Sequence, residues 1–222
     1  MGIDMSFEDF KRISRLACII TIFGVLQFFL LTFLAAFLYP GGYDYFGYYF
    51  SDLGAVVARN GELNSISKVL FSVALIVIAF VLIPFWLTIR LLFTESRREK
   101  ILSKVGSTLG LISSHFIIGV ALLPMDTQLE SHLLVSLLFV LLFVLAALLY
   151  SIAIKLNKNY PNYFGNIGLV LFAIPIASFA VSIMDPFAPL GAFLQKIALY
   201  GYFIWVLLPI YLIWPLVRPE NE

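Results

Sequence analysis

Six long apolar runs constrain this chain more than any other feature of its sequence. Each run reaches roughly 20 residues, the length that a helix needs to cross a hydrocarbon core of about 30 Å. Inside such a core every backbone N–H and C=O must be satisfied within the protein, which favours helices. The predicted spans are Ser14–Leu38, Ser67–Phe93, Ser103–Leu123, Leu133–Ile154, Phe164–Met184 and Phe193–Leu216.

Composition indicates the same fold class. Of the 222 residues, 62% are hydrophobic and 12% are charged, which lies outside the range of soluble domains. We therefore predict an all-α, polytopic membrane protein, a six-helix bundle forming a single transmembrane domain over residues 1–222. A formal net charge of +1, with the basic residues divided among short loops, excludes nucleic acid as a partner. The single cysteine, Cys18, permits no intramolecular disulfide.

The distribution of Lys and Arg predicts the orientation of the spans. Basic residues that flank membrane spans accumulate on the cytoplasmic side. Of the 14 basic residues, all but Arg59, Lys68 and Lys196 flank one set of alternate span ends. We therefore expect a multi-pass protein of the cell membrane with cytoplasmic N and C termini. The long segment Pro40–Ile66, between the first two spans, is then an extracytoplasmic loop.

This loop carries a dense aromatic cluster. The stretch YPGGYDYFGYYFSDLG, residues 39–54, contains five tyrosines. Tyrosines in interfacial belts place their rings against acyl chains and their hydroxyls among head groups, so we expect the segment to lie along the membrane surface. Tyr45 and Tyr49 are the tyrosines that we select as ligand contacts. Asp52 is expected to cap a short helix over Leu53–Arg59, and Asn64 or Ser65 to cap the second span.

The third span combines small residues with a histidine. Gly106 and Gly110, with serines nearby, form a stripe that lets helices approach closely, so we expect this span at the centre of the bundle. His115 falls near the middle of the span, where an ionisable side chain requires a partner or a role. Asp126 follows about three helical turns later, on the same face if the helix continues. A hydrogen bond to a neighbouring helix is an equally good explanation of His115.

The predicted ligand-binding residues lie at the outer ends of different spans, apart from His115, which leads inward from that side. His132 begins the fourth span, and Asp185 follows the fifth, where it has a plain alternative as the close of that helix. The complete set is Asp52, Asn64, His115, Asp126, His132, Asp185, Tyr45 and Tyr49. With two histidines and no HxxxH or HExxH spacing, we predict no metal and no other cofactor. The sequence assigns no catalytic residue.

Several of these motifs are similar to those of a known family. They are the 39–54 stretch, the Asn60-Gly61 and Asn64 that follow it, and a third span that ends in Leu-Leu-Pro-Met-Asp before His132. In these motifs the chain resembles the prokaryotic six-span family catalogued as domain of unknown function 998. The resemblance covers most of the chain and implies the fold and the membrane location, with Asp52 carried over. More distantly, the aromatic lead-in to Ser-Asp-x-Gly looks like the Frag1/DRAM/Sfk1-type eukaryotic membrane proteins, some of which are linked to lipid-anchor remodelling.

The function that we predict is binding of a membrane lipid. An outer-leaflet pocket lined by the acidic and histidine residues, and rimmed by tyrosines, suits a head group that is hydroxyl-rich or cationic, or a bridging cation. Two alternatives stay open. The first is a membrane-embedded, lipid-modifying hydrolase or acyltransferase, with His132 and a carboxylate as general base. The second is a transporter of a small solute or lipid. The sequence does not indicate an oligomeric state.

Overall fold

The computed structural model describes residues 7–184 and 189–217, and these fold into six long helices and two short 3₁₀ helices. In chain order the elements are α1 (Phe7–Phe37), η1 (Phe50–Gly54), α2 (Ser65–Ile89), η2 (Arg90–Leu92), α3 (Arg97–Leu122), α4 (Leu129–Leu156), α5 (Asn162–Met184) and α6 (Pro189–Val217). The six α-helices are long and apolar enough to cross a membrane. The prediction of an all-α, multi-pass membrane protein is confirmed.

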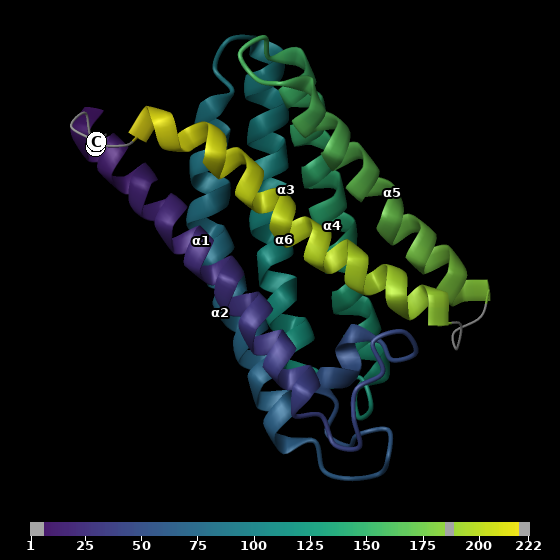
Figure 1. The fold of residues 1–222 in the computed structure, drawn as a ribbon. Coiled ribbons are helices and arrows are strands. Elements are labelled where there is room, and N and C mark those ends of the chain that lie inside the picture. Colours follow the sequence, from purple (N-terminus) through teal and green to yellow (C-terminus); the bar gives the residue numbers. More distant parts are fainter. Residues whose placement is uncertain (1–6, 185–188, 218–222) are drawn as a thin grey trace.

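The helices pack as a closed sequence of neighbours. Each helix lies against the next one along the chain, and α6 returns to contact α1. At one end of the bundle lie residues 38–64, here called the α1–α2 connection, which contain η1 (Figure 1). We call this end the connection end. The α2–α3 and α4–α5 loops lie at the opposite end. Which side of a membrane the connection end faces stays a prediction.

The small-residue stripe of α3 lies close against its neighbours, as predicted, and the side chains that it meets are bulky aromatic rings. A Cβ at Gly110 would overlap the Trp86 ring of α2, and one at Gly106 would lie 3.0 Å from the Tyr150 ring of α4. Between them, the Ser107 hydroxyl donates to the Trp86 carbonyl at 2.5 Å and lies 2.6 Å from the Tyr150 hydroxyl. Small residues therefore bring the three backbones close enough for hydrogen bonds that need no water.

The expectation that the third span occupies the bundle centre is wrong. Helix α3 packs mainly against α2 and α4, whereas α2 also contacts α1 and α6. Buried rings fill the interior instead, among them Trp86, Phe143, Tyr150, Tyr202 and Trp205. Ring centroids that neighbour each other in this group lie 4.7 to 6.5 Å apart; the pairs are Trp86–Phe143, Trp86–Tyr150, Phe143–Tyr202 and Tyr150–Trp205. These large side chains hold the helices apart, so no single helix can lie on the axis.

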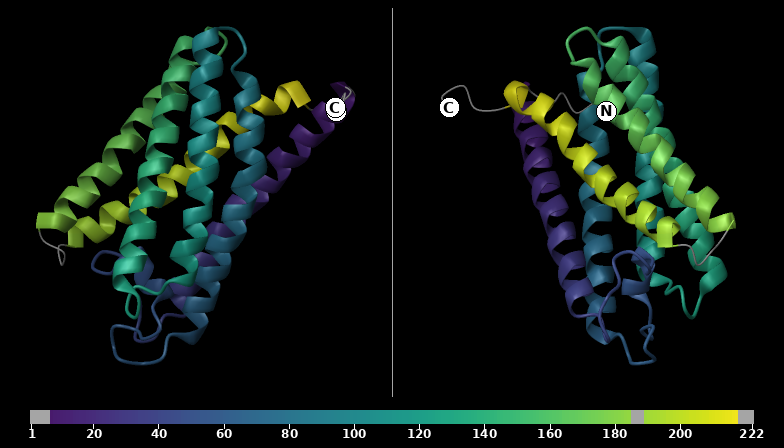
Figure 2. Two further views of the ribbon diagram at one scale, coloured as in Figure 1. Left: turned by 180° about the vertical axis from the view of Figure 1, so that it is seen from behind. Right: turned by 45° about the vertical axis from the view of Figure 1, so that its right-hand side comes forward.

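Helices α1 and α6 form an opening toward the connection end. The two helices approach each other toward the C-terminal end of α6 and diverge toward the α1–α2 connection (Figures 1 and 2). Near the point of divergence the Phe28 and Phe203 rings lie 4.2 Å apart, and Phe29 stacks on Tyr200 at 5.1 Å. The divergence of α1 and α6 leaves room for the groove that is described in the next subsection.

Candidate functional site

The α1–α2 connection folds back on the end of the bundle. Gly41 and Gly42, at φ values of 76° and 88°, turn the chain away from the end of α1, a conformation that favours glycine. Asn60-Gly61 forms a second turn, with Gly61 at φ 87°, between residues Val57 and Leu63, which pair in an antiparallel bridge. Two turns of this kind bring the segment back to the start of α2 and keep it close to the helix ends.

Asp52 is buried within this segment and is fully engaged there. Its side chain accepts the backbone N–H of Tyr49 at 2.7 Å and pairs with Arg59 through two bonds of 2.9 and 3.1 Å. These hydrogen bonds raise the pKa of Arg59 above its ordinary value. The predicted helix over Leu53–Arg59 is wrong, because the short helix is η1, Phe50–Gly54, and Asp52 lies inside it. The carboxylate satisfies protein donors and presents little surface to a ligand.

Asn64 has a similar internal role. The residue is completely buried, and its amide donates to the carbonyls of Leu53 and Ala55 at 3.1 and 3.0 Å. Ser67 donates to the Leu53 carbonyl as well. Asn64 occupies the N-cap position of α2 as predicted, but no side-chain hydrogen bond caps the helix. Its amide instead satisfies carbonyls at the end of η1, which fixes the Ser-Asp-Leu-Gly motif against α2.

Asp126 and His132 stabilise the turn between α3 and α4. The Asp126 carboxylate accepts the backbone N–H of Val57 at 2.9 Å and that of Val56 at 2.9 and 3.0 Å. The His132 Nδ1 lies 2.6 Å from the carbonyl oxygen of Leu123, and since a carbonyl only accepts, Nδ1 carries the proton. Asp126 therefore connects this turn to the α1–α2 connection, and His132 closes the turn itself.

The two remaining polar predictions do not join this group. His115 is exposed on the outer surface of α3, where its Nδ1 lies 2.8 Å from the Leu111 carbonyl. Asp185 falls outside the described residues. Asp52, Asn64, Asp126 and His132 do gather at the connection end, as the sequence predicts, but the structure pairs each of them with protein atoms.

Most of the tyrosines form a small core within the connection. Tyr39 is 3% exposed, and its hydroxyl accepts the backbone N–H of Arg59. The Tyr43 hydroxyl donates to the Tyr49 carbonyl at 2.9 Å, and burial raises the pKa of Tyr43. The Tyr49 hydroxyl lies 3.0 Å from that of Ser182 in α5. The expected surface belt is thus largely an internal cluster, and Tyr45, at 41% exposed, is its most exposed tyrosine.

Lys196 is a functional-site residue that sequence reasoning missed. It lies on α6 and is 5% exposed. Its ammonium donates to the carbonyls of Tyr48 and Ala192 and lies over the Tyr43 ring, 5.6 Å from the centroid. By its position in the sequence it is only a basic residue at a span end. Its signal was available, because a lysine four residues into a predicted span requires oxygen or ring partners.

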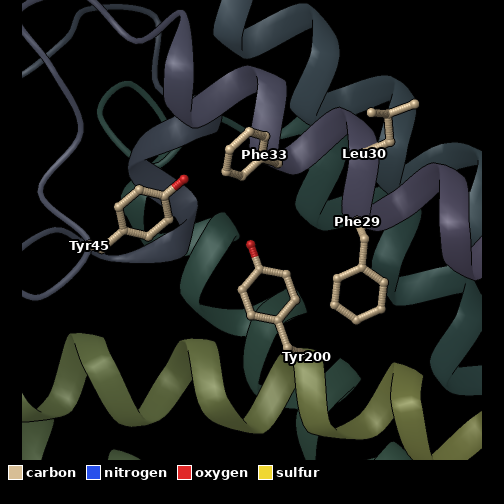
Figure 3. A pocket seen from close by; sticks show the side chains of 5 residues that line it. All are labelled: Phe29, Leu30, Phe33, Tyr45 and Tyr200. Atoms are coloured by element: carbon tan, nitrogen blue, oxygen red, sulfur yellow. The ribbon is translucent and has the colours of Figure 1, made fainter.

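A groove lies between α1, α6 and the connection. Phe29, Leu30 and Phe33 line it from α1, Tyr200 from α6 and Tyr45 from the connection, and its volume is about 580 Å³ (Figure 3). The Tyr45 and Tyr200 hydroxyls both point into the space between the helices. Ligand pockets commonly hold about 300 to 1,000 Å³ and combine apolar walls with a few polar groups. Apart from Tyr45, no lining residue was predicted, because apolar residues in a span carry no individual signal.

The groove offers apolar walls and two hydroxyls, while the neighbouring charged groups are engaged with protein partners. Within residues 7–184 and 189–217, no three His, Cys, Asp or Glu side chains are grouped as metal ligands.

Comparison with known proteins identifies the family. The family model described as "Protein of unknown function (DUF998)" matches residues 22–211, and the chain therefore belongs to this family. The searches of curated proteins and of solved structures found no match. The distant similarity to the Frag1/DRAM/Sfk1-type proteins stays a prediction.

Proposed function

We propose that this member of the DUF998 family binds a membrane lipid, with an acyl chain in the groove between α1 and α6. The observation that carries the proposal is the groove itself, which is apolar on its walls and has tyrosine hydroxyls toward the connection end. In the proposed orientation the termini are cytoplasmic, the α1–α2 connection is extracytoplasmic, and the ligand comes from the outer leaflet of the cell membrane.

The position of the groove supports a lipid as its occupant. Both walls are helices long and apolar enough to span a membrane, so the opening between them faces the hydrocarbon. Leu30 and Phe33 are 58% and 61% exposed, and bilayer lipid is what would cover them. A lipid chain therefore reaches the groove by lateral diffusion and needs no passage through water.

The hydrophobic effect does not drive this binding, which determines where selectivity arises. A chain that moves from bilayer to groove exchanges one apolar environment for another, so its gain comes from close packing and from hydrogen bonds. The aromatic walls provide the packing, and the hydroxyl of Tyr45 provides the main polar contact, because that of Tyr200 is hydrogen-bonded to Thr32. Selectivity should therefore depend on groove shape and on the polar end of the lipid. In the described residues, no observation favours the hydrolase, acyltransferase or transporter alternatives.

The test is retention of lipid by purified protein. We expect native mass spectrometry of detergent-purified protein to show a co-purifying lipid. Leu30→Trp fills the groove and should reduce the occupied fraction at least about fivefold, whereas Leu133→Trp, a leucine of equal exposure on α4, should not.

Phe33→Ala removes one wall, and Phe80→Ala is its matched control, because Phe80 on α2 is 59% exposed and lies outside the groove. Equal lipid retention in both members of each pair would overturn the proposal. So would the absence of any retained lipid from protein that is folded by circular dichroism and gel filtration.

A further inference from the structure

We propose that the groove selects a lipid whose polar end is uncharged and carries hydroxyl or carbonyl oxygens. This inference rests on the proposed function and names the ligand class of that same site. Diacylglycerols and isoprenoid quinones share the chemistry in question, because each presents neutral oxygens at the end of apolar chains. We call the part of the groove nearest the connection its mouth. The charges around the mouth are the reason for the preference.

The groove lining contains no charged side chain. Its five residues are Phe29, Leu30, Phe33, Tyr45 and Tyr200. The two tyrosine hydroxyls are its side-chain hydrogen-bonding groups, and because that of Tyr200 is already hydrogen-bonded to Thr32, the Tyr45 hydroxyl is the main polar contact for a ligand. A tyrosine hydroxyl can donate one hydrogen bond and accept others, which complements a neutral hydroxyl or carbonyl oxygen. A formal charge on a ligand at this position would have no opposite charge within the lining.

The cations near the mouth are already engaged by the protein. Lys196 is buried, donates to two backbone carbonyls and lies over the Tyr43 ring. Arg59 pairs with Asp52 through two hydrogen bonds and lies over the Tyr48 ring, 5.5 Å from its centroid. A phosphate at the mouth would have to displace these contacts, and breaking the bonds of a buried carboxylate is unfavourable.

Asp44 makes the mouth unfavourable for anions. It immediately precedes Tyr45, so the two Cα atoms are about 3.8 Å apart, and its exposed carboxylate accepts the Phe46 backbone N–H at 2.8 Å. Hydrogen bonds from the backbone of Gly47 and Phe46 lower its pKa, which keeps it ionised at neutral pH. Lys196 interacts electrostatically with this carboxylate, but its ammonium is already bonded to two backbone carbonyls. A lipid phosphate beside Asp44 would therefore meet the negative charge and be repelled.

The α1–α2 connection as a whole carries a net negative charge. Residues 38–64 contain three carboxylates, Asp44, Asp52 and Glu62, and one cation, Arg59. Like charges near a protein surface repel over distances up to about 10 Å at ordinary ionic strength. An anionic head group is therefore disfavoured at the mouth, while a neutral one meets no electrostatic penalty and gains the tyrosine hydrogen bonds.

The experiment is a competition assay in detergent micelles. A fluorescent fatty-acyl probe is bound to the full chain and displaced by chain-matched dioleoylglycerol, dioleoylphosphatidylglycerol or dioleoylphosphatidylethanolamine, or by ubiquinone. We expect dioleoylglycerol or ubiquinone to displace the probe at about tenfold lower concentration than the phosphatidylglycerol, since screened repulsion between unit charges is on the order of 1 kcal/mol. The more effective of the two neutral lipids identifies the source of the ligand.

Three variants connect the preference to the residues. Asp44→Asn keeps a side-chain acceptor for the turn and should bring phosphatidylglycerol within about threefold of dioleoylglycerol. Glu62→Gln removes another exposed carboxylate of the same connection, but Glu62 does not adjoin a lining residue of the groove, so it should change the ratio less than Asp44→Asn does. Tyr45→Phe should weaken the neutral lipids about fivefold, the effect of one lost hydrogen bond, with Tyr211→Phe as an exposed control on α6.

The outcomes separate this inference from the proposed function. If the probe does not bind, or if Leu30→Trp binds it as well as the natural protein, the lipid-binding groove itself is refuted. If the probe binds and Leu30→Trp reduces binding, but either phospholipid displaces it as well as the neutral lipids do, only the preference for an uncharged lipid is refuted.

Discussion

Replacing Asp52 by alanine should loosen the α1–α2 connection while leaving the six-helix bundle folded. Asp52 is 4% exposed, and it holds the N–H of Tyr49 and the guanidinium of Arg59. A hydrogen bond to a buried charged acceptor contributes about 1.5 to 3 kcal/mol. The Arg59 side chain is 42% exposed, so solvent screens its pair and reduces its contribution to about 1 kcal/mol. The hydrogen bond to Tyr49 and the pair with Arg59 together contribute about 3 kcal/mol to the stability of the connection.

Hydrogen exchange measured by mass spectrometry reports this change locally. The amides of Asp52, Ala55, Ala58 and Asn64 donate to carbonyls within the connection and exchange only when it opens. Since about 1.4 kcal/mol corresponds to a factor of ten, Asp52→Ala should accelerate their exchange about a hundredfold. Arg59→Met removes the screened pair and the contact with the Tyr48 ring but keeps the Tyr49 hydrogen bond to Asp52, and should accelerate it about fivefold.

Two comparisons make the reasoning refutable. Adding Arg59→Met to Asp52→Ala should have no further effect, because the pair is already broken. Glu62→Ala, at an exposed carboxylate of the same segment, should leave exchange nearly unchanged. Acceleration by Asp52→Ala of less than about threefold would refute the assigned role of the carboxylate. Equal acceleration in α4 peptides would show instead that the whole bundle had been destabilised.

Three further predictions concern the bundle, α6 and pH. Gly110→Ala should lower the unfolding temperature more than Gly106→Ala, because its Cβ overlaps the Trp86 ring, and overpacking of this kind costs about 1 to 3 kcal/mol; equal shifts would contradict the packing. Lys196→Met removes the bonds from the ammonium to the Tyr48 and Ala192 carbonyls, so connection amides should exchange about tenfold faster, the effect of losing hydrogen bonds from a charged donor; unchanged exchange would contradict this role. The lowered pKa of Asp44 means that its stabilising contribution is present above its ordinary value of 3.8 and declines as pH falls through the lower folded value. Exchange of the 44–48 turn, corrected for intrinsic rate, should therefore accelerate only below about pH 4, and Asp44→Asn should abolish that dependence.

Much of the fold could be predicted because a membrane restricts the possible structures of a chain. Each predicted span overlaps one observed helix, since a long apolar run in hydrocarbon has few alternatives to a helix. The close approach of neighbouring helices at Gly106 and Gly110 also followed from residue spacing, but the aromatic rings that they meet did not. The central position assigned to α3 did not hold, because a stripe of small residues shows that neighbours approach closely but not how many neighbours there are.

The candidate site was less accessible to prediction. Residue type indicated that Asp52, Asn64 and Asp126 needed partners, and loop alternation correctly placed them at one end. Their partners are backbone groups and Arg59, chosen by the path of the connection after its glycine turns. A polar side chain has the same identity whether it meets a ligand or an amide of its own chain, so the sequence could not distinguish the two.

The sequence by itself determined that the chain forms six membrane-spanning helices and that polar residues gather at alternate ends of them. Those properties depend on hydropathy and on the length of each run, which are local quantities. Only the tertiary structure decided that Asp52, Asn64 and Asp126 bond to groups of the protein itself and that a groove opens between α1 and α6. Both results depend on the separation and angle of helices distant in the chain. These are determined by the fit of many side chains together and not by any one segment.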